Sequence, residues 1–246
     1  MPPSCGPVRF SPPPEEQRSV STVHLVRHGQ ASFGAADYDQ LSELGQRQCR
    51  RLGQYFAERG QGFDVLWTGS LRRHRQSAEA IADGLGGLPV AEVLPELNEY
   101  DSEALIAALL PQAELERLKA DRSPQAYREH FRLLRSALQA WMDGQIVPVG
   151  MPSWADFQDG IVAALDRARA DLHGQRLLIV SSGGPIATAV AAVLAAPTTT
   201  AIELNLRIRN SGVTEFAFTP KRHMLVSYNG IPHLDDASRQ SWVTYS

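Results

Sequence analysis

The sequence predicts an α/β protein of three layers, α/β/α, in which helices cover both faces of a mostly parallel β-sheet. Short apolar runs alternate with helical patterns along most of the chain, and this order is typical of βαβ units. The 246 residues are 43% hydrophobic and 21% charged, so the chain can bury a sizeable core. A helical stretch interrupts the alternation at about residues 101–153, and we interpret it as a cap inserted into a single domain of residues 21–246.

The first part of this domain is expected to alternate strand and helix twice. The run STVHLV predicts the first strand. A helix is expected over residues 42–59, with Ser42 as its N-cap and Gly60 beyond its end. The run DVLWT then predicts a second strand, and residues 71–86 predict a second helix.

Helical periodicity dominates from residue 101 to about residue 172. The runs SEALIAALL and AYREHFRLLRSALQAWM predict helices of the cap. FQDGIVAALDRARADL predicts a helix of the main layers, because it leads directly into the apolar strand RLLIV. A helix over residues 185–196 follows, with Pro185 as its first residue. The alternating runs GVTEFAF and HMLVSY predict an antiparallel hairpin over residues 212–228.

Composition argues against several classes of protein. The formal charge of −3 leaves no basic surplus, so we expect neither nucleic acid nor an anionic membrane as a partner. Cys5 and Cys49 are the only cysteines, which excludes a disulfide framework and a thiolate metal site. Residues 1–20 are rich in proline and are interpreted as a flexible arm without a signal peptide. We therefore expect a cytoplasmic protein, whose oligomeric state the sequence does not indicate.

Chemically distinctive residues follow two of the predicted strands. The carboxyl ends of parallel strands meet at one edge of a sheet, where helix N-termini attract anions. Arg27, His28 and Gly29 end the first strand: arginine suits a phosphate or carboxylate, and a neutral imidazole can attack phosphorus. After the second strand, residues 72–75 place three arginines and His74 in the first turn of a helix, where cations are unfavourable unless an anion binds. Arg72 and Arg75 are expected to turn to solvent.

Two further segments carry candidate residues. The turn SSGG after RLLIV contains Ser182 and Gly183 and can present N–H groups to an anion, although such turns also occur for purely steric reasons. The segment LPELNEYDSEAL places Glu99 between the sheet and the cap, from where a carboxyl group can protonate a leaving alkoxide. Carboxylates in loops are often only solvated, so this segment alone does not decide the role.

Together these segments resemble the histidine phosphatase superfamily, also called phosphoglycerate mutase-like, over about residues 21–230. The most specific elements are LVRHGQASFG and LSELGQRQ. The segment GSLRRHRQSAEAI is similar to the family's Ser/Asp-Leu-x-Arg-x-x-Gln-Thr-Ala element, which implies that Arg73 is the phosphate-binding arginine. ELNEYD is similar to the family's Leu-x-Glu element, which implies that Glu99 is the proton donor.

The resemblance implies a phosphatase that acts on a small phosphomonoester and needs neither metal nor cofactor. His28 would attack phosphorus and become a phosphohistidine, while Arg27 and Arg73 would bind the equatorial oxygens. Glu99 would protonate the leaving oxygen, and water would later attack the phosphoenzyme. The turn at residues 182–183 would contact the phosphate.

Position 182 departs from the family pattern. Most members continue the later strand as Val-x-His-Gly-Gly, with a second histidine that donates to the phosphate, but Ser182 stands in the matching place. A serine hydroxyl donates one hydrogen bond and carries no charge, so reduced activity is expected unless another residue compensates. His233 and His74 are the candidates for compensation, although each is more simply interpreted as a surface residue.

Three other functions stay open. A phosphoglycerate-mutase-type phosphotransferase needs basic residues in the cap, but the cap mixes basic and acidic residues, which favours a phosphatase. A catalytically impaired phosphate-binding or regulatory module is disfavoured because the chain keeps both a nucleophile and an acid. Dinucleotide binding is weaker still, because RHGQASFG lacks the G-x-G-x-x-G spacing.

Overall fold

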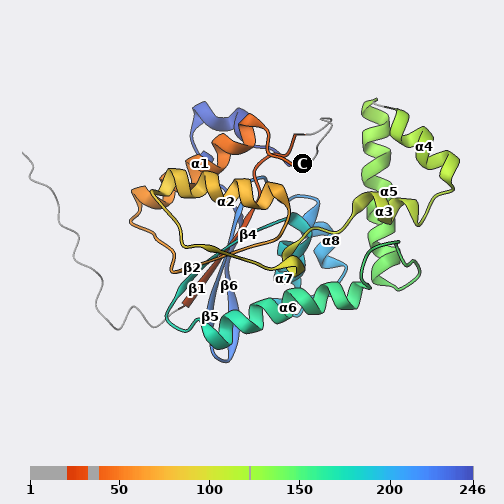
Figure 1. Ribbon diagram of the computed structural model, residues 1–246. Coiled ribbons are helices and arrows are strands. Elements are labelled where there is room, and N and C mark those ends of the chain that lie inside the picture. Colours follow the sequence, from red (N-terminus) through yellow and green to blue (C-terminus); the bar gives the residue numbers. More distant parts are fainter. Residues whose placement is uncertain (1–20, 33–38, 122, 246) are drawn as a thin grey trace, which may run out of the picture.

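The computed structural model describes residues 21–32, 39–121 and 123–245, so the arm predicted at residues 1–20 lies outside the described residues (Figure 1). In this part of the chain six strands form one sheet in the order β3-β2-β4-β1-β5-β6. The first four strands run parallel, and β5 and β6 extend the sheet as an antiparallel hairpin. The strands are β1 (Ser21–Arg27), β2 (Val65–Thr68), β3 (Ala91–Val93), β4 (Arg176–Ser181), β5 (Val213–Thr219) and β6 (Arg222–Gly230).

Helices cover both faces of the sheet. Figure 1 shows α1 (Glu43–Glu58) and α2 (Arg72–Leu85) on one side, and α6 (Trp154–Asp171) and α7 (Gly183–Val193) on the other. Successive side chains of a strand point to opposite faces, so β4 contributes to two cores. Its residues Leu178 and Val180 pack with α1 and α2, and Leu177 and Ile179 pack with α6 and α7. The predicted three-layer α/β fold is confirmed.

The helices of the segment predicted to form a cap lie beyond one end of this arrangement (Figure 1). The long helix of the cap buries Leu134, Leu138 and Trp141 against Trp154 and Phe157 of α6, so the cap shares a core with the main layers. The cap helices are α3 (Ser102–Ala107), α4 (Gln112–Ala120) and α5 (Pro124–Met142). The remaining helices are α8 (Thr200–Asn205) and the 3₁₀ helices η2 (Pro95–Leu97), η3 (Pro232–Leu234) and η4 (Ala237–Trp242). Among all these helices, none combines the length and apolarity needed to cross a membrane.

The start of α7 differs from the prediction. The helix begins at Gly183, with Ser182 as N-cap, so Pro185 is its third residue and not its first. The first four N–H groups of a helix have no acceptor within the helix, so proline forfeits no hydrogen bond there. This earlier start brings the N-terminus of α7 directly to the end of β4.

Candidate active site

Residues from four segments meet at the carboxyl ends of the parallel strands. Arg27 and His28 end β1, Arg73 and His74 lie in the first turn of α2, Ser182 precedes α7, and Glu99 follows η2. The His74 Nε2 atom lies 2.7 Å from Ser182 Oγ, and the rings of His28 and His74 are 5.9 Å apart between centroids. The Gly184 N–H, two residues after Ser182, donates to Glu99 Oε1 over 3.0 Å.

His28 is fixed by the backbone. Its N–H donates to the Ser181 carbonyl over 2.9 Å, and its Nδ1 lies 2.7 Å from the Gly29 carbonyl oxygen. A carbonyl only accepts hydrogen bonds, so Nδ1 carries the ring proton and Nε2 carries the lone pair. Burial, followed by the charges of Arg27 and Arg73, lowers the pKa of His28 well below its usual value. The imidazole is therefore neutral, as a nucleophile must be.

Both arginines are buried and both are held by oxygen acceptors. Arg27 Nη1 donates to the Ile208 carbonyl over 2.6 Å and to the Tyr245 carbonyl over 2.9 Å. Arg73 Nη1 donates to Asp39 Oδ1 over 2.8 Å. Arg72 and Arg75, as expected, are exposed.

Asp39 was not foreseen from the sequence. Its carboxylate accepts from the Arg72 N–H over 2.8 Å as well as from the Arg73 side chain, so it lies at the N-terminus of α2. The cluster of cations in that turn requires an anion, and an internal carboxylate supplies one. Because 34 positions separate Asp39 from Arg73, no local pattern could have indicated the pair.

Glu99 is partly buried and lies against the N-terminus of α7. Both of its carboxylate oxygens accept from the Gly184 N–H, at 3.0 and 3.2 Å. Burial raises the pKa of Glu99, although this N–H and the charges of Arg73 and Arg27 oppose the rise. A Cβ atom at Gly184 would lie 2.1 Å from Glu99 Oε1, so the contact requires glycine at that position. Glu99 therefore holds a proton more readily than an ordinary glutamate.

Two interpretations of histidines as surface residues are wrong. His74 is completely buried, because the first turn of α2 faces the end of β4 and directs the ring toward Ser182. His233 is also buried, but its Nε2 lies 2.8 Å from Ser211 Oγ, since η3 carries it under the loop that follows α8. Of the two candidates for compensation, the structure brings only His74 to Ser182.

Further residues surround the turn after β4. Gly183 begins α7 beside Asn205, whose side-chain amide donates to the Tyr100 hydroxyl over 2.5 Å. Within the ranges that the structure describes, no three His, Cys, Asp or Glu side chains gather in a way that could hold a metal ion.

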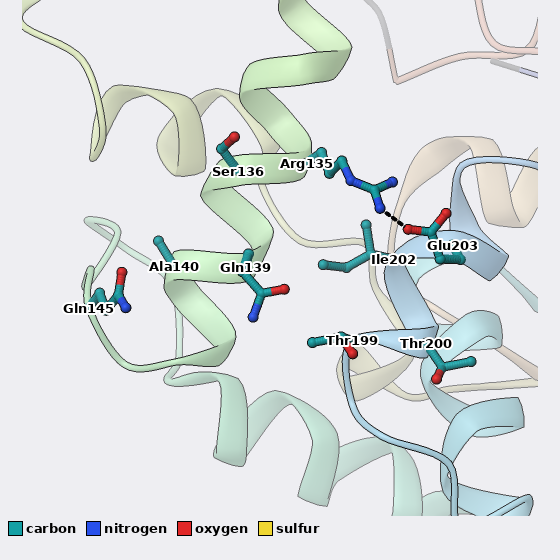
Figure 2. Close-up of a pocket in the computed structure, with 9 residues that line it drawn as sticks. All are labelled: Arg135, Ser136, Gln139, Ala140, Gln145, Thr199, Thr200, Ile202 and Glu203. Atoms are coloured by element: carbon teal, nitrogen blue, oxygen red, sulfur yellow. Dashed lines mark hydrogen bonds and ion pairs between the residues drawn. The ribbon is translucent and has the colours of Figure 1, made fainter.

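A cavity of about 610 Å³ lies between α5 and α8 (Figure 2). Arg135 of α5 and Glu203 of α8 point toward each other across it and form an ion pair. A small hollow is lined in part by Gly184 and Tyr100, and it shares Ile202 with the larger cavity. None of the predicted site residues lines the larger cavity.

A family model described as the histidine phosphatase superfamily (branch 1) matches residues 23–230. The chain belongs to this superfamily, as its strand-end motifs indicate.

Several known proteins are similar to the chain. It is 32% identical over 84 residues to a 2,3-bisphosphoglycerate-dependent phosphoglycerate mutase of Methylorubrum populi, and the match spans 31% of this chain and 40% of that relative. A phosphoglycerate mutase structure from Bacillus anthracis matches with a TM-score of 0.60 at 19% identity, over 89% of this chain and 97% of that one. A phosphoserine phosphatase structure from Entamoeba histolytica, in complex with 3-phosphoglyceric acid, matches with a TM-score of 0.58 at 20% identity, over 87% and 99%. At these identities the structures establish the shared fold.

Proposed function

We propose that the protein is a phosphatase that hydrolyses a phosphomonoester through a phosphohistidine on His28, without a metal ion. The observation that carries the proposal is the state of His28. The ring is neutral, its Nδ1 proton is donated to the Gly29 carbonyl, and the charges of Arg27 and Arg73 act both on His28 and on Glu99, whose pKa is raised. These are the groups that attack on phosphorus requires.

Arg27 and Arg73 neutralise the charge of the phosphoryl group during transfer. Two fixed positive charges next to the nucleophile stabilise the charge that spreads over the equatorial oxygens. Asp39 holds the Arg73 side chain in place beside the N-terminus of α2. Ser182 and Gly183 contact the phosphate from the N-terminus of α7, where the helix dipole favours an anion.

Glu99 protonates the leaving oxygen when His28 attacks. Its raised pKa supports this role, because a general acid must hold a proton near neutral pH. After the leaving group departs, the same carboxylate accepts a proton from the water that attacks the phosphohistidine. His28 Nε2 is then released with its lone pair, and inorganic phosphate leaves the site.

The substrate we propose is a small phosphorylated molecule whose remaining part extends toward the cap. The small hollow supports this direction, because Gly184 of α7 and Leu138 of α5 both line it. Structures with the same fold were solved with phosphoserine and with 3-phosphoglyceric acid. We propose that residues 101–153 form the cap that selects the substrate. The cytoplasm stays the expected compartment, in keeping with a buried, free Cys49.

A phosphoglycerate-mutase-type phosphotransferase is the second candidate function, because the relative from Methylorubrum populi bears that name. The two reactions share the phosphohistidine and differ in its acceptor. Labelled phosphohistidine protein mixed with 3-phosphoglycerate separates them: release as inorganic phosphate supports the phosphatase, and transfer to the added acid supports the mutase.

The proposal is tested by incubating the protein with a labelled aryl phosphate in the presence of a chelator. We expect turnover, and a phosphoryl group on His28 that is stable in base and labile in acid. His28→Ala must lose both, whereas His24→Gln, which alters a buried histidine in the middle of β1, must keep both. A wild-type protein that binds phosphate but shows neither label nor turnover would instead be a binding module.

A further inference from the structure

The Ser182 hydroxyl does not cap the N-terminus of α7. Ser182 is the N-cap residue of α7, yet its side chain accepts no cap hydrogen bond within the described chain. The Gly184 N–H, which belongs to the first turn, donates to Glu99 instead. The other helices with serine at the N-cap accept a first-turn N–H on the serine oxygen in the ordinary way, and their cap residues are Ser42, Ser123 and Ser153.

The Ser182 hydroxyl is directed to the imidazole of His74. Their atoms Oγ and Nε2 are 2.7 Å apart, and both residues are completely buried. The other ring nitrogen of His74, Nδ1, is buried and has no hydrogen-bond partner among the described residues. The ring packs against Gly69, where a Cβ atom would lie 2.3 Å from Nδ1. This packing fixes the ring in one orientation.

These contacts decide which nitrogen of His74 carries the proton. Burial, followed by the charge of Arg73, lowers the pKa of His74 to about 3, so the ring is neutral and has one N–H. A proton on Nδ1 would be a buried donor without an acceptor, whereas a proton on Nε2 is donated to Ser182 Oγ. The second tautomer leaves no buried N–H unpaired. It also directs the hydroxyl proton of Ser182 away from His74.

We propose that His74 is a positioning residue for phosphoryl transfer: its Nε2–H donates to Ser182 Oγ and turns the Ser182 hydroxyl proton toward an oxygen of the transferring phosphoryl group. The inference rests on the proposed phosphatase function. An imidazole on α2 and the hydroxyl that precedes α7 thus act together at position 182, where the resemblance implies that most of the family has a histidine. The hydrogen bond from Ser182 strengthens as charge develops on the phosphoryl oxygens, so it lowers the barrier to transfer.

The test measures kcat and KM for an aryl phosphate in single and double variants. We expect His74→Ala and Ser182→Ala each to lower kcat about 100-fold, which is typical when one preorganised donor is lost. Because His74 acts through Ser182, the double variant should be about as slow as Ser182→Ala alone. His74→Gln should recover most of the activity, since its amide can donate from nearly the same place as Nε2. His24→Gln is the control for loss of a buried imidazole.

A folded His74→Ala protein with wild-type kcat would overturn the inference, and so would losses that multiply in the double variant. Failure of the proposed function looks different, because wild type itself would then be inactive.

A second measurement does not depend on turnover. Nitrogen NMR of the histidine rings, with inorganic phosphate or vanadate bound, should show His74 as the Nε2–H tautomer, and Ser182→Ala should shift that signal. A proton on Nδ1 of His74 would refute the inference whether or not the protein is an enzyme. This NMR measurement also tests the inference if His74→Ala does not fold.

Discussion

Asp39 relieves the unfavourable placing of arginines at the N-terminus of α2. The sequence indicates that an anion is needed there but not which residue supplies it. Three arginines in the first turn of α2 oppose the helix dipole, and the sequence therefore indicates an anion there. The structure supplies the Asp39 carboxylate, which accepts from the Arg72 N–H and from the Arg73 side chain. A phosphate that binds Arg73 therefore joins a guanidinium that already has a carboxylate partner.

The two buried arginines are expected to be indispensable. We predict that Arg27→Ala and Arg73→Ala each lower kcat for an aryl phosphate about 100- to 1000-fold and weaken the binding of inorganic phosphate, because each removes a fixed charge beside His28. Steady-state kinetics and calorimetry measure the two effects. Arg75→Ala is the matched control, since Arg75 lies in the same turn but is exposed. Full activity in either test variant would contradict the proposed pocket.

If Glu99 is the general acid, the rate of His28 phosphorylation should depend on pH and on the leaving group of the substrate. The pKa of Glu99 is raised, and the leaving oxygen needs its proton. We therefore predict that the rate of His28 phosphorylation by an alkyl phosphate falls as pH rises through that pKa, because Glu99 becomes deprotonated. Glu99→Gln should be slow at every pH and lack this limb. With an aryl phosphate, whose leaving group needs no proton, the variant should lose much less. Rapid-quench labelling measures both rates, and equal losses with the two substrates would exclude the role.

The sequence predicted which site residues lie close together better than it predicted their burial and their hydrogen-bond partners. Arg27, His28, Arg73 and Glu99 come together because parallel strands end at one edge and helices begin there. The burial of His74 was missed, since periodicity in a short first turn does not tell which side faces the neighbouring strand end.

At the scale of elements, α1 and α2 pack so closely that glycine is required on both. A Cβ atom at Gly53 would lie 2.1 Å from the Ile81 carbonyl oxygen, and one at Gly84 would lie 2.0 Å from the Arg50 carbonyl oxygen. These atoms belong to the backbones of the helices, so a clash cannot be relieved by a side-chain rotation. The helix that carries Arg73 and His74 is thereby held at a fixed distance from α1.

We predict that Gly53→Ala and Gly84→Ala each lower the free energy of unfolding by about 1–3 kcal/mol. Alanine favours a helix over glycine by about 1 kcal/mol, but separating two packed backbones costs more than this gain. Urea unfolding measures the difference. Gly62→Ala is the control, because the nearest atom to its Cβ would be 3.8 Å away. If the Gly84 and Gly62 variants unfold at the same urea concentration, the helices do not pack this closely.

Elements with a strong local signal were predictable, and elements made by tertiary contacts were not. Helix α1 follows its Ser42 cap and its apolar face, and β4 follows its apolar run. Strand β3 has three exposed residues and exists because it pairs with β2 at the edge of the sheet. The start of α7 was missed because two glycines obscure a helix that the Glu99 carboxylate helps to begin.

At the scale of the whole molecule, buried neutral histidines should make the fold sensitive to acid. Burial lowers the pKa of His24 to about 4, of His74 and His233 to about 3, and of His28 well below its usual value. The unfolded chain takes up protons near pH 6.5, and the folded chain does not until the pH is far lower. The stability that these rings contribute is therefore present above about pH 6.5 and is lost as the pH falls toward 3–4.

We predict that the free energy of unfolding falls between pH 7 and pH 5, approaching a slope of about 1.4 kcal/mol per pH unit for each of these histidines. Urea unfolding at several pH values measures it. His24→Gln should remove one histidine's share of the slope while leaving the shares of His28, His74 and His233. A free energy of unfolding that stays constant over this range would mean that these rings are not buried as neutral groups.

Strand β1 lies between β4 and β5, and Arg27 at its end donates to the Tyr245 carbonyl, 218 positions further along the chain. A ribosome that adds about 5–20 residues per second therefore needs roughly 10–40 s to deliver that partner after it has made Arg27. For most of this interval, until β4 at residues 176–181 has been made, the nascent polypeptide carries an apolar strand without either neighbour, so chaperones are expected to shield it. The pocket itself is complete only after Tyr245 has been made.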